Sequence, residues 1–352
     1  MLGITSPVNN NVRVFKSTQS NPIVKNNPVS FKGCNIELEG PSKDTFVSSS
    51  SALSAKSKIG SLDEKEKEVL AENLAKAGYS AFEAGNYQAC ISALDKSLEL
   101  NPNNARGYHT KASAEKELGL FAQAIENYTK AIQLRPDSAN SLRLLALTKE
   151  KYAKELETSD ELAAKSVRLS AVGDYAKYIS AVQANASFDT PLKIANALER
   201  KAEILMGEKS FESAIDDYNN AIEIYSSQLE QEPSNAKLRE KIGEAYHKKA
   251  RCYQLLSKSP FSNEAEEAVQ NYTKALEYVP NSANTYFRRA QLNKKLNTKA
   301  AVDDLKRAID LAPKRYQYWQ ALGEIMTLSD NPAEREVGFE FLAKATQLKM
   351  NK

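Results

Sequence analysis

Few residues in this chain have the types and the spacing that enzyme chemistry needs. The phosphate-binding pattern GxxxxGK[ST], the dinucleotide pattern GxGxxG, the nucleophile pattern GxSxG and the metalloprotease pattern HExxH do not occur. His109 and His247 are the only histidines, and Cys252, five residues after His247, is poorly placed to share a helix face with it. The sequence therefore predicts a protein that is not an enzyme and has no metal and no cofactor.

The adjacent carboxylates and the widely spaced cysteines also favour a protein without a catalytic or metal site. Asp216–Asp217 and Asp303–Asp304 are adjacent pairs, and adjacent residues on a helix point about 100° apart. We expect these acids to be solvated surface charges. The three cysteines show no CxxC spacing, which favours a reducing compartment and argues against a disulfide framework or a zinc site.

The composition is that of a globular protein without a membrane span, and it gives no reason to expect nucleic acid as a partner. Of the 352 residues, 41% are hydrophobic and 26% are charged, and the net charge is +3. No run approaches the roughly 18 apolar residues of a membrane helix, so no membrane span is expected. With this charge, nucleic acid is not the expected partner, and the cytoplasm is the expected location.

Residues 1–60 differ from the rest of the chain. They are rich in Asn, Ser and Pro and sustain neither a helical nor an alternating pattern. We expect a disordered leader, because such a segment buries too little apolar surface to offset its ordering entropy. Its first 36 residues contain no acid, so import into an organelle is the alternative.

One segment of the sequence is repeated along the chain. AIENYTKAIQLRPDSAN (124–140) and AVQNYTKALEYVPNSAN (268–284) share ten of 17 positions without a gap. Weaker copies begin at Cys90, Ala214, Ala301 and Gly338, and the first two copies along the chain are 34 residues apart. A repeated unit of this length predicts a stack of similar supersecondary structures.

Each copy predicts two helices that pack through small residues. In the first helix, a large residue is followed four positions later by Gly or Ala; in the second, a small residue is followed by a large one after four positions and a small one after seven. Small residues let two helix backbones approach closely, and proline ends the second helix. The positions that carry this pattern are Gly78, Ala112, Ala202, Ala250, Ala290, Trp319 and Gly323 in first helices, Ala124, Tyr128, Ala131, Ala214, Ala268, Tyr272 and Ala275 in second helices, and Pro136 and Pro280 after them.

These positions resemble the tetratricopeptide repeat family over residues 62–350. The resemblance implies an all-α, right-handed superhelical solenoid of antiparallel helix pairs, with about seven hairpins. The expected domains are two repeats in 61–138, a divergent helical hairpin in 139–191 and four repeats in 192–352. Because the pattern fades in 139–191, this segment is either a seventh hairpin with lengthened helices or a break between two blocks.

The resemblance also implies a function, which is to bind a peptide or helix of another protein in a concave groove lined by first helices. Counting from the repeat anchors gives one set of groove candidates: His247, Lys248, Arg251, Asn284, Arg288 and Lys294. Their charge favours an acidic partner. The competing interpretation is that they are ordinary solvated helix charges.

Three further alternatives stay open at the level of sequence. Some members of the family bind a chaperone tail with a clamp that includes Lys and Asn, which makes a co-chaperone role one alternative, but Ala75 and Tyr79 stand at the matching positions of the first repeat. The chain is alternatively a regulatory or targeting subunit of an enzyme or assembly complex. Self-association is expected if the last repeat, which has no separate capping helix before Lys352, pairs with a second copy.

Overall fold

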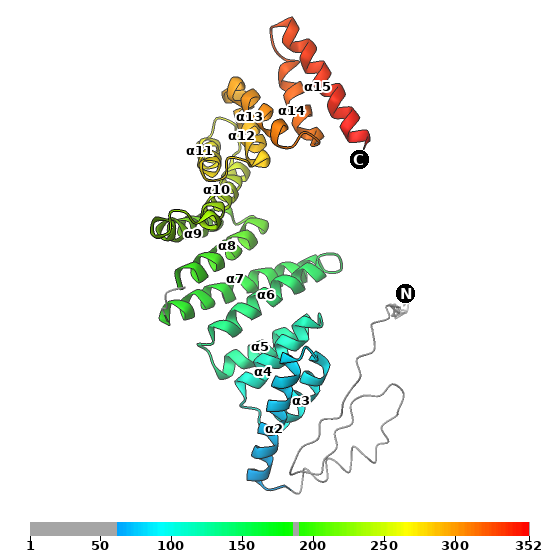
Figure 1. Ribbon diagram of the computed structural model, residues 1–352, viewed down its shortest axis with the longest axis vertical. Helices are drawn as coiled ribbons and strands as arrows, with labels where there is room; N and C mark the ends of the chain where they lie inside the picture. The colour runs from blue at the N-terminus through cyan, green and yellow to red at the C-terminus, as the bar shows by residue number, and fades with distance from the viewer. Residues whose placement is uncertain (1–61, 186–189, 352) are drawn as a thin grey trace, which may run out of the picture. The chain divides into compact units, whose positions relative to one another are not determined.

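The computed structural model describes residues 62–185 and 190–351, and this part of the chain folds into 14 α-helices, α2 to α15. The predicted leader, residues 1–60, lies outside the described residues. Figure 1 shows the helices following one another in chain order as antiparallel pairs. The described chain is a solenoid of helix hairpins, as the sequence predicts.

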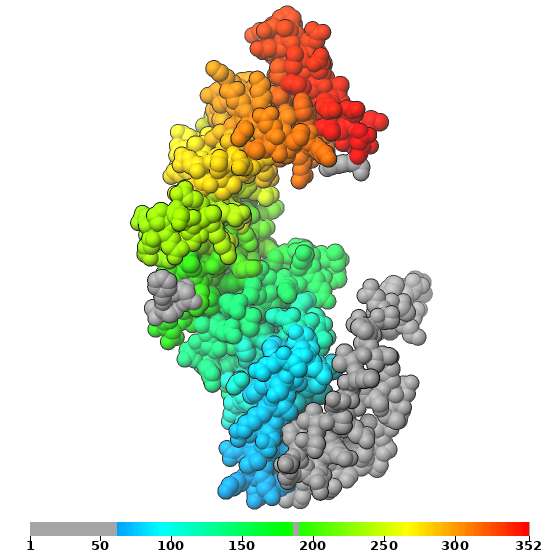
Figure 2. Space-filling view, viewed as in Figure 1, coloured from blue at the N-terminus to red at the C-terminus, as the bar shows by residue number. Residues whose placement is uncertain are grey.

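Seven hairpins make up the described array, each with a first and a second helix. They are α2 (Glu64–Glu83) with α3 (Tyr87–Leu100), α4 (Ala105–Glu117) with α5 (Phe121–Leu134), α6 (Ala139–Leu156) with α7 (Glu161–Ala184), α8 (Thr190–Gly207) with α9 (Phe211–Gln231), α10 (Ala236–Leu256) with α11 (Asn263–Tyr278), α12 (Ala283–Leu296) with α13 (Thr298–Leu311), and α14 (Tyr316–Met326) with α15 (Pro332–Met350). The main contacts lie within hairpins and between hairpins adjacent in the chain. In the space-filling view the colours accordingly follow one another in bands (Figure 2).

Asparagine side chains fix the first turn of several helices. The Oδ1 atoms of Asn86, Asn104, Asn235 and Asn297 each accept a hydrogen bond from a backbone N–H group in α3, α4, α10 and α13. Such caps satisfy N–H groups that have no partner within the helix. The local sequence therefore determines where these helices begin.

Glycine and proline fix the turns. Gly85 and Gly119 have φ angles of 74° and 77° in the turns within the first two hairpins, a conformation that strains residues with a Cβ atom. Pro136 and Pro280 each stand two residues beyond the last residue of α5 and α11. Proline cannot continue a helix, so these positions separate one hairpin from the next.

The small residues of the repeat pattern lie in the core. All of the predicted alanines are buried, most of them completely: Ala112, Ala124, Ala131, Ala202, Ala214, Ala250, Ala268, Ala275 and Ala290. Tyr128 and Tyr272 are also fully buried among them, whereas Trp319 is half-buried and packs its ring on Phe341. Close helix packing around these residues holds neighbouring hairpins together.

Glycine allows the closest approaches between helices. A Cβ atom built on Gly323 of α14 would lie 2.8 Å from the backbone oxygen of Gly338 in α15. In the first hairpin, a Cβ atom on Gly78 would lie 2.6 Å from Cγ of Leu94. No side chain fits between these helices, so the pattern glycines are required by packing.

Two of the acids predicted to be solvated are buried instead, and that part of the prediction is wrong. Asp217 and Asp304 are each 5% exposed, and each forms an ion pair with a cation from the first helix of its own hairpin. Lys201 Nζ lies 2.8 Å from Asp217 Oδ1, and Arg289 Nη2 lies 2.7 Å from Asp304 Oδ1. Both acids directly precede the large residue of the second helix, which turns them toward the first helix rather than toward water.

No helix among residues 62–185 and 190–351 combines the length and the apolar character that crossing a bilayer requires.

Candidate functional site

Successive first helices touch through polar side chains, which together form one surface. We call it the first-helix face. Its cross-helix contacts join Tyr79 to Asn104, His109 to Ser141, Glu150 to Arg200, Glu199 to Lys248, His247 to Thr285 and Lys294 to Glu324. The apolar pattern residues face the core, so this polar surface is the part of the repeats that is left for other interactions.

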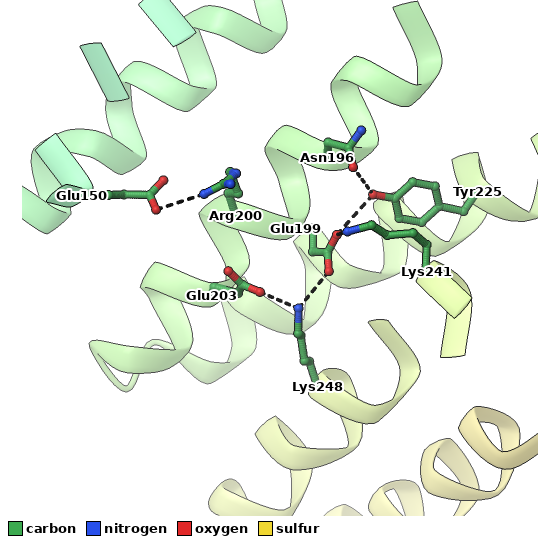
Figure 3. Close-up of polar contacts among 8 residues, drawn as sticks. All are labelled: Glu150, Asn196, Glu199, Arg200, Glu203, Tyr225, Lys241 and Lys248. Atoms are coloured by element: carbon green, nitrogen blue, oxygen red, sulfur yellow. Dashed lines mark hydrogen bonds and ion pairs between the residues drawn. The ribbon is translucent and has the colours of Figure 1, made fainter. Parts of the chain in front are cut away.

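A buried carboxylate organises the middle of this face (Figure 3). Glu199 on α8 is 4% exposed and accepts hydrogen bonds from Lys241 Nζ and Lys248 Nζ on α10, both at 2.8 Å. The hydroxyl of Tyr225 on α9 also donates to Glu199, at 3.2 Å, and to Asn196, at 2.9 Å. One acid thus joins three helices of two adjacent hairpins.

The charge of Glu199 is stabilised by its partners. Burial by itself disfavours ionisation, but the hydrogen bonds and charges of Lys241 and Lys248 outweigh it and lower the pKa of the carboxyl. The same contacts raise the pKa of Lys248 against the effect of burial. Both groups are therefore ionised at neutral pH and form an ion pair that connects α8 to α10.

The charged groove candidates differ in whether they form ion pairs with acidic side chains. Lys248 pairs with Glu203 as well as Glu199, and Lys294 Nζ lies 3.5 Å from Glu324 Oε2. Arg251 is exposed and Arg288 is half-buried, and neither forms an ion pair with an acid of the described residues. The predicted basic strip is thus partly neutralised by acids of neighbouring first helices.

Two other candidates, His247 and Asn284, belong to a polar cluster at the junction of α10 and α12. His247 Nδ1 lies 2.8 Å from Thr285 Oγ1, and Asn284 Nδ2 lies 3.4 Å from His247 Nε2. The imidazole ring packs edge-on to Tyr272, with centroids 5.3 Å apart. The cluster borders a pocket of about 240 Å³ that is also lined by Lys248.

Burial shapes the ionisation of this cluster. Burial, followed by the nearby positive charges of Arg288, Arg251 and Lys248, lowers the pKa of His247 to about 4. The imidazole is therefore neutral at physiological pH. A neutral ring held between a hydroxyl and an amide is a structural joint and is not poised as a general base.

An equivalent cluster joins α4 to α6. His109 Nδ1 lies 2.9 Å from Ser141 Oγ, Asn140 Nδ2 lies 3.4 Å from His109 Nε2, and the ring packs edge-on to Tyr128 with centroids 5.6 Å apart. Burial lowers the pKa of His109 as well. The two histidines of the chain thus occupy the same place in two different hairpin junctions.

The larger opening on this face lies among α6, α7 and α8, and we call it the α6–α8 pocket. Its volume is about 630 Å³. Its polar lining consists of the cations Arg143, Lys193 and Arg200 and the amides Asn140, Asn185 and Asn196, together with Thr190. Its apolar lining consists of Ala139, Leu147, Tyr175, Tyr178, Ala181, Val182 and Ala197. A space of this size accommodates several residues of a peptide.

The charged side chains described at this pocket are cations. Among the lining residues within 62–185 and 190–351, none is an aspartate or a glutamate. Arg143 donates to Asn140 Oδ1 at 3.1 Å, and Arg200 donates to Glu150 Oε2 at 3.2 Å. Glu150 also accepts a hydrogen bond from the hydroxyl of Tyr175, which ties α7 to α6 beside the pocket.

The pocket forms where the repeat pattern departs from its rule. In α7, Ala171 and Tyr175 occupy the first small and the large position, but Tyr178 stands at the second small position, where the other second helices have Ser or Ala. A large ring thus stands where the other second helices have a small side chain, and it forms part of the wall of the pocket. The sequence contains this signal, although the repeat anchors predict no groove candidate in residues 139–191.

The two cysteines that the structure describes, Cys90 and Cys252, are buried. Burial raises the pKa of Cys90 and of Cys252 to about 11, so that little thiolate exists at neutral pH. Among the described residues, no group of three or more His, Cys, Asp or Glu side chains could hold a metal ion. The face thus offers hydrogen bonds and charges rather than a nucleophile with a base.

Comparisons with known proteins agree with this geometry. The family model described as Tetratricopeptide repeat matches residues 71–104 and 105–138, which correspond to the first two hairpins. Sperm-associated antigen 1 of Rattus norvegicus is 31% identical over 134 residues, which are 37% of this chain and 15% of that protein. Mitochondrial import receptor subunit TOM70 of Rattus norvegicus is 25% identical over 157 residues, which are 45% of this chain and 22% of that protein. The chain thus spans less than a quarter of the length of these relatives.

Solved structures give distant similarities. BtubC from P. vanneervenii aligns with a TM-score of 0.49 and 15% identity, covering 67% of this chain and 91% of that one. YrrB aligns with a TM-score of 0.43 and 16% identity, covering 66% of this chain and 98% of that one.

Proposed function

Because this chain belongs to the tetratricopeptide repeat family, whose repeats form scaffolds for protein–protein interaction, we propose that it holds a segment of another protein against its first-helix face. In this proposal the chain performs no chemistry of its own, as is general for the family. Recognition comes from side chains that the array fixes in space. The partner segment is a peptide or a helix.

The observation that carries the proposal is the α6–α8 pocket. It opens among two first helices and one second helix, and its wall combines apolar side chains with cations and amides. Protein ligand sites typically combine such an apolar lining with a few polar groups that fix orientation. The pocket therefore suits a segment that buries apolar side chains and pairs its polar groups.

Rigidity supports the same function. The ion pairs of Glu199 connect α8 to α10, and the histidine clusters connect α4 to α6 and α10 to α12. A surface held in place before binding loses little conformational entropy when the partner arrives. The cross-helix contacts thus contribute to affinity without touching the partner.

The first block of the array does not favour the chaperone-tail alternative. Ala75 is 4% exposed and packs in the core, so it presents nothing to a partner. The hydroxyl of Tyr79 contacts Asn104, and the guanidinium of Arg106 lies 4.3 Å from its ring centroid. Neither residue supplies the cation or the amide that would hold a terminal carboxylate.

Among scaffold functions, we favour a receptor or adaptor role, which keeps the targeting-subunit alternative open. The similarity to mitochondrial import receptor subunits over 45% of the chain supports it. A cytoplasmic location and self-association stay predictions. Measuring the mass of the full chain by sedimentation at micromolar concentration tests the latter, and a strictly monomeric chain would contradict it.

A pocket-filling variant tests the proposal. The immobilised full chain is offered a display library of random 12-residue peptides, and enriched peptides are titrated against two variants. Ala181→Trp fills the α6–α8 pocket, whereas Ala176→Trp places the same ring on an exposed part of α7 outside it. We expect Ala181→Trp to weaken binding by about tenfold or more and Ala176→Trp to leave it unchanged. No enrichment, or enriched peptides that bind both variants equally, would contradict the proposal.

A further inference from the structure

We propose that Arg251 of α10 and Arg288 of α12 form a site on the first-helix face that binds the phosphoryl group of a phosphoserine or phosphothreonine in the partner segment. This inference rests on the proposed function and adds one chemical feature of the partner. The site lies beside the His247 cluster, in a different part of the face from the α6–α8 pocket.

The helical register brings the two arginines together. Arg251 stands four residues after His247 on α10, and Arg288 stands four residues after Asn284 on α12. Asn284 Nδ2 lies 3.4 Å from His247 Nε2, and first helices run in the same direction, so the arginines follow this contact one turn further along. Burial lowers the pKa of His247 and raises that of Tyr272, and the charges of both arginines add to the first shift and oppose the second. Both guanidinium groups therefore lie close to the same two rings.

Neither guanidinium group is paired with an acid. Among the described residues, no carboxylate forms an ion pair with Arg251 or Arg288. The Nε atom of Arg288 is buried and has no hydrogen-bond partner in this part of the chain. The helices around the two arginines, α8, α9, α11 and α13, are described over their whole length. A buried donor without an acceptor is costly, so an anion bound here would satisfy it.

The junction between α4 and α6 shows that the arginines are not needed to build this kind of contact. It has the same histidine, asparagine, hydroxyl and tyrosine, but Ser113 and Leu144 stand at the positions of Arg251 and Arg288. Ser113 Oγ lies 2.9 Å from the hydroxyl of Tyr128, and Leu144 packs on the apolar cluster around that ring. The packing of the junction therefore does not account for the arginine pair.

The charge of the pair matches a phosphoryl group. Lys248 already pairs with Glu199 and Glu203, and Lys294 Nζ lies 3.5 Å from Glu324 Oε2. The two arginines thus supply the unpaired positive charge here. A phosphomonoester carries about −1.5 to −2 at pH 7 and offers three acceptor oxygens, whereas a side-chain carboxylate carries a single charge. Guanidinium groups bind such oxygens through paired hydrogen bonds.

The surroundings of the pair suit a polypeptide. The pocket of about 240 Å³ beside it is lined in part by Gly243, Ala275 and Val279, so it can receive a side chain next to the phosphorylated residue. Its one acidic lining residue, Glu244, lies about two helical turns before Arg251. A nucleic acid presents a row of phosphates, but the neighbouring lysines are held by acids, so the site is a single positive spot.

A phosphopeptide library tests the inference on the full chain. The immobilised chain is offered synthetic 11-residue peptides with phosphoserine at the centre and random flanking residues. Enriched peptides are then made with phosphoserine, serine or glutamate at that position and labelled with fluorescein. Anisotropy titration should show that the phosphoserine form binds about tenfold or more tightly than the other two, and that added salt reduces the difference.

Two double variants locate the effect. Arg251→Ser with Arg288→Leu introduces the residues of the α4–α6 junction, so the thermal midpoint should stay within about 4 °C of the parent. The phosphoserine form should lose about tenfold or more in affinity and reach the level of the serine form. The matched control, Lys306→Gln with Arg307→Gln, removes the same charge from exposed positions of α13 and should change the affinity by less than about twofold.

Several results would overturn the inference. Equal weakening by both double variants would show that binding follows overall charge. A serine or glutamate form that binds as tightly as the phosphoserine form would exclude selection of a phosphoryl group, and so would a library that enriches no phosphopeptide. A thermal midpoint lowered by more than about 10 °C in Arg251→Ser with Arg288→Leu would assign the arginines to the structure of the junction.

The remaining outcomes separate this inference from the proposed function. If the phosphorylated and serine forms bind equally while library peptides still lose affinity with Ala181→Trp, the function stands and phosphoryl recognition is wrong. If phosphopeptides depend on the arginine pair but no peptide depends on Ala181, the phosphoryl site stands and the α6–α8 pocket is not where partners bind. A 5′-phosphorylated oligothymidine that binds more tightly than the phosphopeptides, with loss in the arginine variant, would overturn the peptide assignment.

Discussion

His109 and His247 stand at equivalent positions in two junctions of the array, each with its Nδ1 atom against a hydroxyl of the next first helix, at 2.9 Å from Ser141 and 2.8 Å from Thr285. This relationship explains why the sequence repeats one phrase so closely. The tyrosine and the asparagine shared by the two copies contact the two rings, and the shared serine pairs with the hydroxyl that each ring contacts. The repeated segment, residues 124–140 and 268–284, therefore specifies a junction between two hairpins.

The first prediction concerns the pH dependence of stability. His247 has a pKa of about 4 in the folded chain and about 6.5 when unfolded. Between these values the unfolded state binds more protons, so the free energy of unfolding falls as the pH falls from 6.5 to 4. In His247→Asn this contribution is absent, and the slope between pH 6 and pH 4.5 should decrease by up to about 1.4 kcal/mol per pH unit.

Urea unfolding at several pH values measures that slope. Comparing the variant with the unaltered chain cancels the contribution of the carboxylates, which is common to both. An unchanged slope would mean that the His247 ring titrates in the folded chain as it does in water, contrary to its burial in the junction.

The second prediction concerns the buried carboxylate of Glu199. Glu199→Gln removes the charge that pairs with Lys241 and Lys248 but keeps the shape of the side chain. We expect a loss of about 1–3 kcal/mol in the free energy of unfolding at pH 7, because Lys241 loses its carboxylate partner and Lys248 loses one of its two. Glu240→Gln, on the exposed side of α10, should cost less than about 0.5 kcal/mol.

The effect of Glu199 should also depend on pH. Because its pKa is lowered in the folded chain, its contribution is fully present above the unfolded pKa of about 4.3 and is lost as the pH falls through the folded value. Chemical denaturation at pH 7 and below pH 4 tests both statements. A difference between variant and parent that persists undiminished in acid would contradict this assignment.

The third prediction contrasts two helical glycines. A Cβ atom on Gly323 would lie 2.8 Å from the backbone oxygen of Gly338, whereas one on Gly173 of α7 would meet no heavy atom within 4 Å. Gly323→Ala should therefore destabilise the chain by about 1–3 kcal/mol, and Gly173→Ala should stabilise it by roughly 0.5–1 kcal/mol. Thermal unfolding of the two variants gives opposite shifts if the helix contact is as close as described, and shifts of the same sign if it is not.

The fold could be predicted from the sequence because its determinants are local and repeated. A small residue at Ala124, a large one at Tyr128 and a small one at Ala131 define a helix face within two turns, and the same spacing recurs along the chain. All three residues are buried. Spacing alone was sufficient here, since each hairpin packs mainly on its neighbours in the chain.

The site was much harder to predict, because pairing across helices is not local. Lys248 was a groove candidate on the basis of its place in α10, but its two acidic partners on α8 are 49 and 45 residues away. Asp217 was expected in water for the same reason, since its partner Lys201 lies on another helix. Position on a helix predicts the direction of a side chain and does not predict whether its charge is already paired.

The departure from the repeat pattern at Tyr178 indicates the position of the pocket better than the repeat anchors do. Tyr178 interrupts the small-residue rule in the one segment where the repeat fades, and the α6–α8 pocket forms beside it. In a solenoid whose other hairpins follow the rule, a large residue at a small position implies either strain or an opening between helices.

Site-specific photocrosslinking tests the central claim most directly. A benzophenone amino acid is placed at Asn196, which lines the α6–α8 pocket, or at Lys177, which is exposed on α7 outside it, and each full chain is irradiated with a saturating library-selected peptide. The account predicts that the peptide is crosslinked from position 196 and not from position 177. A bound peptide that crosslinks from position 177 and leaves position 196 unlabelled would show that partners are held elsewhere.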